Sequence, residues 1–238
     1  MSMQDDKKNF DRIYNQDKDK KKKTPWLLVA AVALVLVAVI LLAVFLKSYT
    51  GVIHLSSNDN GVTFTDKLSG VTYELAPMCY EPIAIWSDKT YAKYGDMIFY
   101  TVRDAEPKEY ICSKYSGAYD LYYSSDITLP SLEEFEASHT RVCKQGVIAI
   151  NTHSIEEKTV DIVSYFLSAE TVDHTEITNV RTTLYLKLMS EKYDFMYYNI
   201  TYYRTQSGQS YLFDRTTGRC VSLGDRFVED IEGADNDQ

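Results

Sequence analysis

The sequence predicts an α+β protein, with a single N-terminal transmembrane helix followed by one extracytoplasmic domain of an antiparallel β-meander and two or three helices packed on the sheet. Three observations predict it. Residues 26–46 form an uncharged apolar run, residues 180–223 alternate between apolar and polar side chains, and helix-start motifs precede that alternation. Helices laid on one face of an antiparallel sheet define the α+β class.

The apolar run is long enough to cross a membrane. Trp26–Leu46 carries no charge over 21 residues, and at about 1.5 Å of helical rise per residue it reaches roughly 31 Å, against a hydrocarbon core about 30 Å thick. A cleaved signal peptide is the alternative, but its apolar region usually has about 7 to 15 residues. We therefore expect an uncleaved signal-anchor helix with membrane lipid as its partner.

Charge orients this segment. Residues 1–25 hold eight basic and five acidic residues, a net of +3, and residues 47–238 hold 17 basic and 29 acidic residues, a net of −12, which together give the −9 of the whole chain. Short basic segments stay cytoplasmic, so we predict a single-pass protein of the cell membrane with its C-terminal domain outside. Lys20, Lys21, Lys22 and Lys23 are expected to contact anionic headgroups, at about 1 kcal/mol each.

Composition divides the chain into four parts. Residues 1–25 are too polar to form a core and predict a disordered cytoplasmic segment. Residues 26–46 are the predicted helix, and residues 47–224 are long enough for one ordinary domain. Residues 225–238 carry six acidic residues against Arg226 alone, which predicts a disordered acidic tail.

Strand and helix signals alternate in the first part of the domain. Segments 62–66 and 71–75 flank a Leu-Ser-Gly turn and predict a β-hairpin. Segments 83–86 and 97–103 predict two strands around a short helix that begins at Ser87 and ends at Gly95.

Two capping boxes predict helix starts further along the chain. They begin at Ser131 and Ser154, each followed three residues later by Glu. Residues 146–151 between them form an apolar run that is typical of a buried strand. After the second box, one helical face is expected to hold Val160, Val163, Phe166 and Leu167.

The C-terminal third predicts a four-stranded meander. Leu184, Leu186 and Leu188 alternate with polar residues, which is the pattern of a strand with one face on a core. Segments 196–202, 211–214 and 219–223 continue the pattern after short turns.

Four cysteines lie beyond the apolar run: Cys79, Cys112, Cys143 and Cys220. An even number on an oxidising side suggests two disulfides, for which three pairings exist, and Cys143 with Cys220 is the one we favour. The alternative is four thiols packed as small apolar residues. Their spacing contains no Cys-x-x-Cys, so it supports neither a zinc site nor a redox pair.

Catalytic motifs were sought without success. The sequence contains no Gly-x-Ser-x-Gly, no His-Glu-x-x-His and no glycine-rich phosphate loop, and it lacks the basic aromatic patch that nucleic acid requires. His153 with Glu157, and His174 with Glu176, lack a third metal ligand. Sugar hydrolysis requires at least two carboxylates, which Glu133, Glu134 and Glu136 could supply. Their position in the first turn of a predicted helix, where acidic side chains interact favourably with the helix dipole, is a simpler explanation. We predict no catalytic residue, cofactor or metal.

Aromatic residues supply the remaining candidate site. Tyr185, Tyr197, Tyr203 and Phe195 are predicted on the meander face opposite the leucines. Exposed aromatics stack on sugar rings or anchor a protein partner. Burial under a helix or loop is the structural alternative, since Tyr is a common strand residue.

Three functions fit these features. The one we favour is a single-pass, membrane-anchored extracytoplasmic binding or assembly subunit, whose partner is a protein or a cell-envelope polymer. The second is a cell-envelope hydrolase using an acid pair, which requires a cleft with two carboxylates. The third is a sensory co-component, which requires a ligand cavity in the outer domain.

Overall fold

The computed structural model describes residues 24–59, 61–115, 118–144 and 150–233. The chain divides into two compact units, Met1–Gly51 and Val52–Gln238, and each is described here by itself. Lys20, Lys21, Lys22 and Lys23 lie outside the described residues, as does the whole predicted cytoplasmic segment before Thr24.

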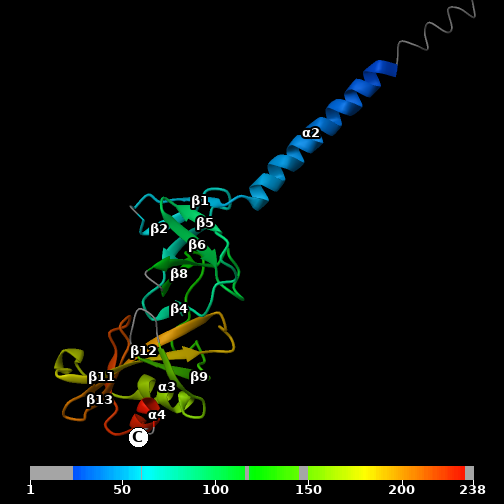
Figure 1. Cartoon of the computed structure of the whole chain (residues 1–238). Helices are drawn as coiled ribbons and strands as arrows, with labels where there is room; N and C mark the ends of the chain where they lie inside the picture. The colour runs from blue at the N-terminus through cyan, green and yellow to red at the C-terminus, as the bar shows by residue number, and fades with distance from the viewer. Residues whose placement is uncertain (1–23, 60, 116–117, 145–149, 234–238) are drawn as a thin grey trace, which may run out of the picture. The chain divides into compact units, whose positions relative to one another are not determined.

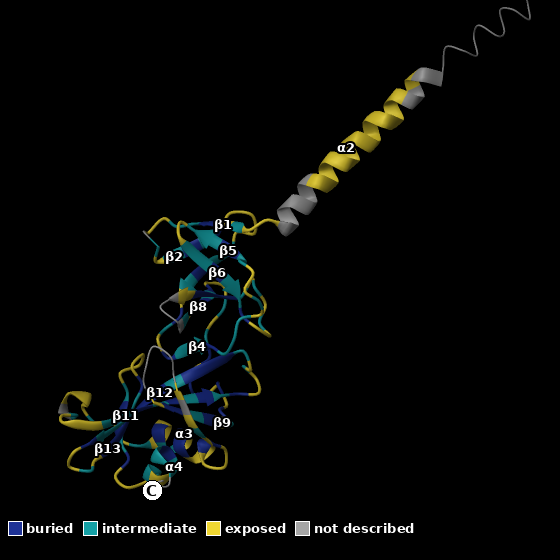
Figure 2. Cartoon of the chain, viewed as in Figure 1, coloured by how far each residue is buried: buried dark blue, intermediate teal, exposed yellow. Residues whose placement is uncertain are grey.

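The first unit contains helix α2, Thr24–Thr50. Its large apolar side chains are exposed wherever they are described, from 55% at Val37 to 83% at Trp26 (Figure 2). Among the described residues, no helix is both long enough and apolar enough to cross a membrane, which contradicts the predicted transmembrane signal-anchor helix.

The second unit is mostly β, so the predicted α+β class is wrong. It contains a closed seven-stranded barrel and a second, seven-stranded sheet (Figure 1). The barrel follows the order β1 (Ile53–Ser56), β2 (Thr63–Asp66), β3 (Thr72–Leu75), β8 (Ala118–Ser124), β7 (Tyr110–Tyr115), β6 (Met97–Thr101) and β5 (Ala92–Tyr94). The parallel pairing of β1 with β5 closes it, and its other neighbours are antiparallel.

Aromatic rings fill the barrel. Phe64 has no exposed surface, and its ring lies 5.0 Å from that of Phe99 and 5.5 Å from that of Tyr122, in edge-to-face contacts. Edge-to-face pairs at these distances are a favourable packing of aromatic rings. The predicted hairpin of β2 and β3 is confirmed and supplies Phe64 and Tyr73 to this interior.

The second sheet contains the predicted meander. Its order is β10 (Ile150–Ile155), β9 (His139–Lys144), β11 (Val180–Met189), β12 (Met196–Thr205), β13 (Ser210–Phe213) and β14 (Cys220–Ser222), with β4 (Tyr80–Pro82) pairing beside β13 on β12. The four C-terminal strands are antiparallel neighbours in chain order, as the alternation predicts. Leu184, Leu186 and Leu188 are buried, so the predicted register is also confirmed.

Two helices lie on the leucine face of this sheet (Figure 1). Helix α3, Thr159–Ser168, buries Ile162, Val163 and Phe166, whereas Val160 is 59% exposed and Leu167 38% exposed, so the predicted inward face is only half right. The predicted cap at Ser154 is wrong because that residue belongs to β10, and the helix begins after Lys158 with no side-chain cap.

The capping box at Ser131 forms without a helix. The backbone N–H of Ser131 donates to the Glu134 carboxylate at 2.8 Å, and the N–H of Glu134 donates to the Ser131 hydroxyl at 3.3 Å. Glu136 then takes a left-handed backbone conformation with φ of 52°. Because L side chains rarely continue a helix from that conformation, one turn forms and the predicted helix ends there.

Three further segments do not have the structure that the sequence predicts or lie largely outside the described residues. Residues 83–86 contribute one isolated bridge, Ile85 with Val102, rather than a strand. The segment between Ser87 and Gly95 contains β5 instead of a helix, and Gly95, with φ of 55°, turns the chain into β6. Most of the apolar run 146–151 lies outside the described residues.

No disulfide joins the four cysteines, all of which the structure describes, so the disulfide prediction is contradicted. The favoured pair is excluded by the sheet order, since β11, β12 and β13 separate Cys143 on β9 from Cys220 on β14. Strands are about 4.8 Å apart, which places these residues roughly 19 Å from one another, and a disulfide needs Cα atoms within about 7 Å. Cys112 lies on β7 in the barrel.

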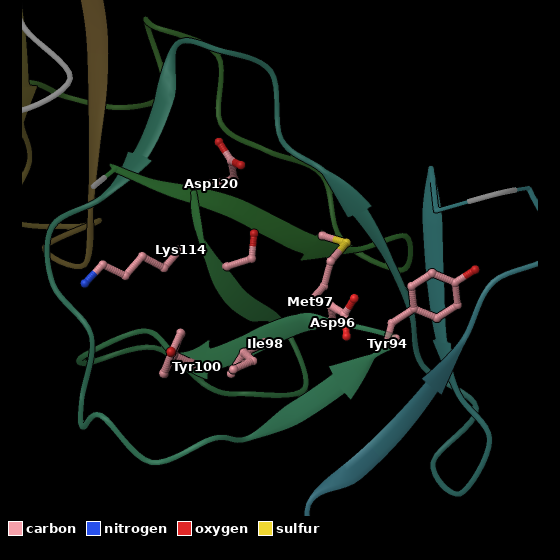
Figure 3. A pocket seen from close by; sticks show the side chains of 9 residues that line it. Tyr94, Asp96, Met97, Ile98, Tyr100, Lys114 and Asp120 are labelled. Carbon is pink, nitrogen blue, oxygen red and sulfur yellow. The ribbon is translucent and has the colours of Figure 1, made fainter. Parts of the chain in front are cut away.

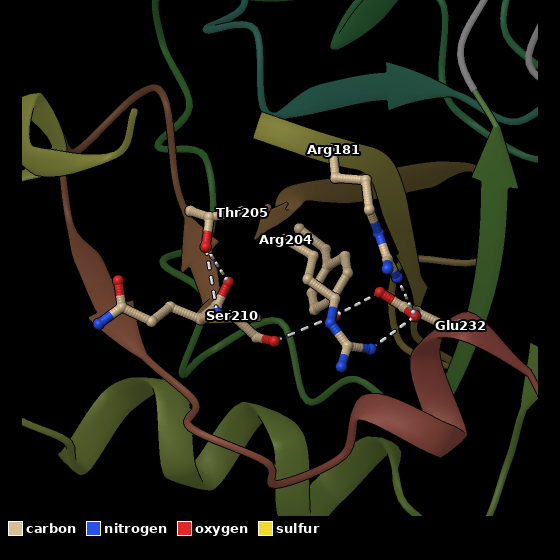
Figure 4. Close-up of polar contacts among 7 residues, drawn as sticks. Arg181, Arg204, Thr205, Ser210 and Glu232 are labelled. Carbon is tan, nitrogen blue, oxygen red and sulfur yellow. Dashed lines mark hydrogen bonds and ion pairs between the residues drawn. The ribbon is translucent and has the colours of Figure 1, made fainter. Parts of the chain in front are cut away.

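The predicted acidic tail begins with packed structure. Helix α4, Val228–Glu232, buries Ile231 completely, and the His153 imidazole Nε2 lies 2.9 Å from the carbonyl oxygen of Asp230. Glu232 accepts hydrogen bonds from the Arg204 guanidinium and the Tyr202 hydroxyl, each at 2.8 Å (Figure 4). Helix α4 is therefore packed on the domain through Ile231 and Glu232, and residues 234–238 lie outside the described part.

Candidate functional site

The candidate site is the sheet face opposite α3, which we call the tyrosine face. Cross-strand register defines it, because paired residues share a side of the sheet. Tyr185 pairs with Cys143 on one side and Thr201 on the other, and Lys187 pairs with Arg141 and Asn199. The full set is Glu81, Arg141, Cys143, Thr183, Tyr185, Lys187, Tyr197, Asn199, Thr201, Tyr203, Tyr211 and Phe213.

One end of the tyrosine face is built around Tyr197. Its hydroxyl accepts a hydrogen bond from Arg141 Nη1 at 2.8 Å. The Lys187 ammonium lies 5.2 Å from the ring centroid, and the Arg141 guanidinium lies 5.9 Å from it. Only 6% of Tyr197 is exposed, and burial raises the pKa of its hydroxyl. The ring therefore serves as a platform that holds two cations in place.

Lys187 on β11 is partly neutralised by Glu81 on β4, which lies on the far side of β12. Its Nζ donates to both carboxylate oxygens of Glu81 at 2.7 Å, and the Lys187 side chain is 12% exposed. Asn199 Nδ2 donates to the same carboxylate at 3.2 Å. Because a charge this poorly hydrated needs a partner, this pair fixes Lys187 beside Tyr197.

The other end is built around Arg215, which follows β13. Its guanidinium lies 5.8 Å from the centroid of the Tyr185 ring, and its Nη2 donates to the Tyr203 hydroxyl at 3.4 Å. Tyr203 in turn lies 6.4 Å from the ring of Phe213, on which His174 stacks at 5.1 Å. Tyr185, Tyr203 and Phe213 are partly exposed and Arg215 is exposed, so this end is open to a partner.

Among the described residues, neither Arg141 nor Arg215 forms an ion pair with a carboxylate. Residues 47–238 have a net charge of −12. The tyrosine face together with Arg215 nevertheless holds three cations, Arg141, Lys187 and Arg215, against one acid, Glu81. The local charge is therefore opposite in sign to the net charge of residues 47–238.

The structure places three of the four aromatic residues that the sequence predicts for a binding surface on one side of the sheet, but Tyr197 is buried and only Tyr185 and Tyr203 are partly exposed. Tyr185, Tyr197 and Tyr203 lie on the tyrosine face. Phe195 precedes β12 and packs on Tyr110, with ring centroids 4.7 Å apart, so it lies outside the strand register that defines the tyrosine face. The alternation of apolar and polar residues does not predict which side chains of other strands Arg141 and Lys187 contact. The order of the strands in the sheet brings both side chains to the ring of Tyr197.

A second candidate is a hollow of about 570 Å³ on the barrel. Its lining includes Tyr94, Asp96, Met97, Lys114 and Asp120 (Figure 3). Burial raises the pKa of the Asp120 carboxyl. Lys114 and Asp120 point away from one another in Figure 3, so the polar groups do not converge on one point as they do in most ligand sites.

The weaker candidates from the sequence have structural roles. Glu134 caps its own turn, and Glu136 pairs with Lys192 at 2.8 Å. His153 contacts α4, and His174 stacks on Phe213. Within the described ranges, no group of three or more His, Cys, Asp or Glu residues is arranged to hold a metal ion.

The chain was also compared with known proteins. No family model, no curated protein and no solved structure matches it. Function is therefore argued from the geometry of the tyrosine face alone.

Proposed function

We propose that this protein is a binding or assembly subunit that engages its partner through the tyrosine face. The observation that carries the proposal is the pairing of Arg141 and Arg215 with tyrosine rings in the absence of any carboxylate partner within the described residues. Tyr and Arg are the residues most enriched where binding energy concentrates. Cations held over rings are also pre-organised, which lowers the entropy lost when they meet a ligand.

We also propose a location at the cell membrane, with the unit from Val52 onward outside the cytoplasm. Two observations support it: the net charge of +3 before residue 26 against −12 after residue 46, and the exposed apolar side chains of α2. Contiguous exposed apolar surface of this kind requires an apolar environment or partner. Protease added to intact cells is expected to digest the C-terminal unit and to leave an epitope on residues 1–20 protected. A protected C-terminal unit would refute this location.

The binding proposal is tested with the full chain in detergent and washed cell envelopes from its own source. We expect the chain to co-sediment with the envelopes, and the double variant Tyr185→Ser/Tyr203→Ser to lose most of this binding. Tyr165, which packs on the other side of the sheet and donates to the Ser222 carbonyl at 2.8 Å, supplies the matched control. Equal binding by Tyr165→Phe, Tyr185→Ser/Tyr203→Ser and the parent chain would refute the proposal.

A further inference from the structure

We propose that two copies of this chain associate through the outer edge of β10, which pairs antiparallel with the same strand of the second copy. This inference goes beyond the proposed function, because it concerns an edge of the second sheet and not the tyrosine face. It is argued from the unpaired backbone of β10, from an exposed isoleucine on this strand and from the charges at its two ends.

The two outer strands of the second sheet differ in what covers them. Beside β14, Thr171 forms an antiparallel bridge with Val221. The next residue, Val172, donates its N–H to the Cys220 carbonyl at 2.9 Å, so an extended segment of the chain itself occupies this edge. At the opposite edge, β9 is the only strand that pairs with β10 among the described residues. The outer edge of β10 therefore presents unpaired N–H and C=O groups, to which a further extended strand can add.

Strand β10 has only one of the features that usually protect an outer strand from such addition, which are charged residues, proline and bulges. Its sequence, INTHSI, contains no Lys, Arg, Asp, Glu or Pro. It does contain a bulge at Thr152, which leaves Ile150, Asn151 and the three residues 153–155 in register with β9. Ile150, Thr152 and Ser154 are exposed, so the strand is accessible to a partner along its length.

An apolar side chain on this edge lacks a neighbour that the second copy can supply. The register with β9 and β11 places Ile150 on the side of Leu184 and Ile155 on the side of Leu188, so both isoleucines lie on the leucine face. Antiparallel pairing of all six residues places Ile150 of each copy opposite Ile155 of the other. Ile150 is 64% exposed and Ile155 only 6%. Pairing therefore covers an exposed apolar side chain on each copy.

The charges at the two ends of β10 have opposite signs. Exposed Lys144 lies beside Ile150 at one end, and exposed Glu156 and Glu157 follow Ile155 at the other. None of these three charged residues forms an ion pair within the described part of the chain.

Antiparallel pairing brings Lys144 of each copy toward the two glutamates of the other. The backbones of these residues are then about two strand spacings, or roughly 10 Å, apart. Opposite charges attract over this distance when the screening length is about 10 Å or more, as it is at or below about 0.1 M salt. Parallel pairing places like charges together instead, so the charges favour a second copy in the antiparallel direction.

Sedimentation equilibrium of the full chain, in a detergent matched in density to the solvent, measures the mass of the protein alone. We expect this mass to rise from that of one chain toward that of two as the protein concentration is raised, and the association to weaken as salt is added. The mass of one chain at every concentration would overturn the proposal.

A charge exchange tests the edge itself. Lys144→Glu alone, and Glu156→Lys/Glu157→Lys alone, each place like charges together at both ends of the paired strands, so each variant is expected to associate at least tenfold more weakly. An equal mixture of the two variants restores opposite charges at both ends and should associate as the parent does. This recovery also shows that both variants are folded.

Lys114→Glu is the matched control, because Lys114 is also an exposed lysine near the end of a strand, on β7 of the barrel. It should associate as the parent does. Equal association of the parent and of each edge variant alone would overturn the proposal. So would a mixture that fails to recover, or a loss in Lys114→Glu as large as that in Lys144→Glu.

Amide hydrogen exchange tests the pairing of backbones. Exchange in residues 150–155 should slow as the protein concentration is raised, whereas exchange in Cys220–Ser222 of β14 should not change, because that edge is already covered. Unchanged exchange in residues 150–155 at concentrations where the mass doubles would overturn the proposal.

Discussion

Truncating Leu186 to alanine tests the register on which the tyrosine face depends. Leu186 has no exposed surface and pairs with Val142 on β9 and Ile200 on β12. It belongs to the same buried cluster as Ile162 and Phe166 of α3. Leu186→Ala removes three carbons from this layer, and such truncations cost about 2 to 5 kcal/mol. For a domain of this size, roughly 2 to 4 °C is lost per kcal/mol, so the melting temperature should fall by roughly 4 to 20 °C.

Thermal and urea unfolding of the full chain in detergent, followed by circular dichroism, measures this loss. Tyr185→Ala is the control, because Tyr185 is the next residue along β11, partly exposed on the opposite face. We expect Tyr185→Ala to lose less than half as much stability as Leu186→Ala. A larger loss for Tyr185→Ala would refute the reasoning, and so would a folded Leu186→Asp, because a one-residue slip exchanges the two faces of a strand.

Three other predictions concern the cysteine thiols, helix α4 and the loop at Asp59. Without reductant, the intact mass should equal that of the reduced chain and all four thiols should alkylate in denaturant; a mass about 4 Da lower would show two disulfides. Burial raises the pKa of the Cys79 and Cys220 thiols to about 11, so both should react slowly at pH 8 in the native protein. Ending the chain at Gly224 removes the buried Ile231 and leaves Arg204 without its partner Glu232, so the free energy of unfolding should fall by about 3 kcal/mol or more. Ending the chain at Gly233 is the control and should change the free energy of unfolding little. Equal stability of the two truncated chains would contradict the packing of α4. Hydrogen bonds from Thr63 and Ser57 lower the pKa of the Asp59 carboxyl from 3.8 to about 2. Because the pKa is lower in the folded than in the unfolded chain, the ionised carboxylate should stabilise the folded loop above about pH 4, and this stabilisation should disappear toward pH 2. An NMR titration of the carboxyl resonances measures the pKa of Asp59, and a midpoint near 3.8 would contradict the prediction.

Local signals predicted well where a strand had to satisfy only its immediate neighbours. The alternation around Leu184, Leu186 and Leu188 predicted both the meander and its buried face. Successive side chains of a strand point to opposite faces of the sheet, so the three leucines must share one face. The hairpin of β2 and β3 was predicted for a similar reason, since Gly70, with φ of 80°, permits the turn.

Helix signals were less reliable because they are short. The box at Ser131 makes its two hydrogen bonds, but they stabilise one turn only, and Glu136 then leaves the helical region. Ser154 has the same motif in a strand, where its pairing with Arg141 decides its conformation. The two hydrogen bonds of a capping box contribute too little free energy to fix a helix by themselves. Strand pairing and the burial of the neighbouring side chains decide whether a helix follows.

The sequence by itself determined the alternating faces of the meander, the turns between its strands and the side of the sheet that holds Tyr185, Tyr197 and Tyr203. Tertiary structure alone decided that β1 closes a barrel with β5, that β9 lies between β10 and β11, and that Cys143 and Cys220 are too far apart to bond. It also placed Arg141, from one strand, on the ring of Tyr197, from another 56 residues later. Side-chain direction is a local property of the backbone, whereas strand order depends on how distant segments bury their apolar faces together, which no local pattern records.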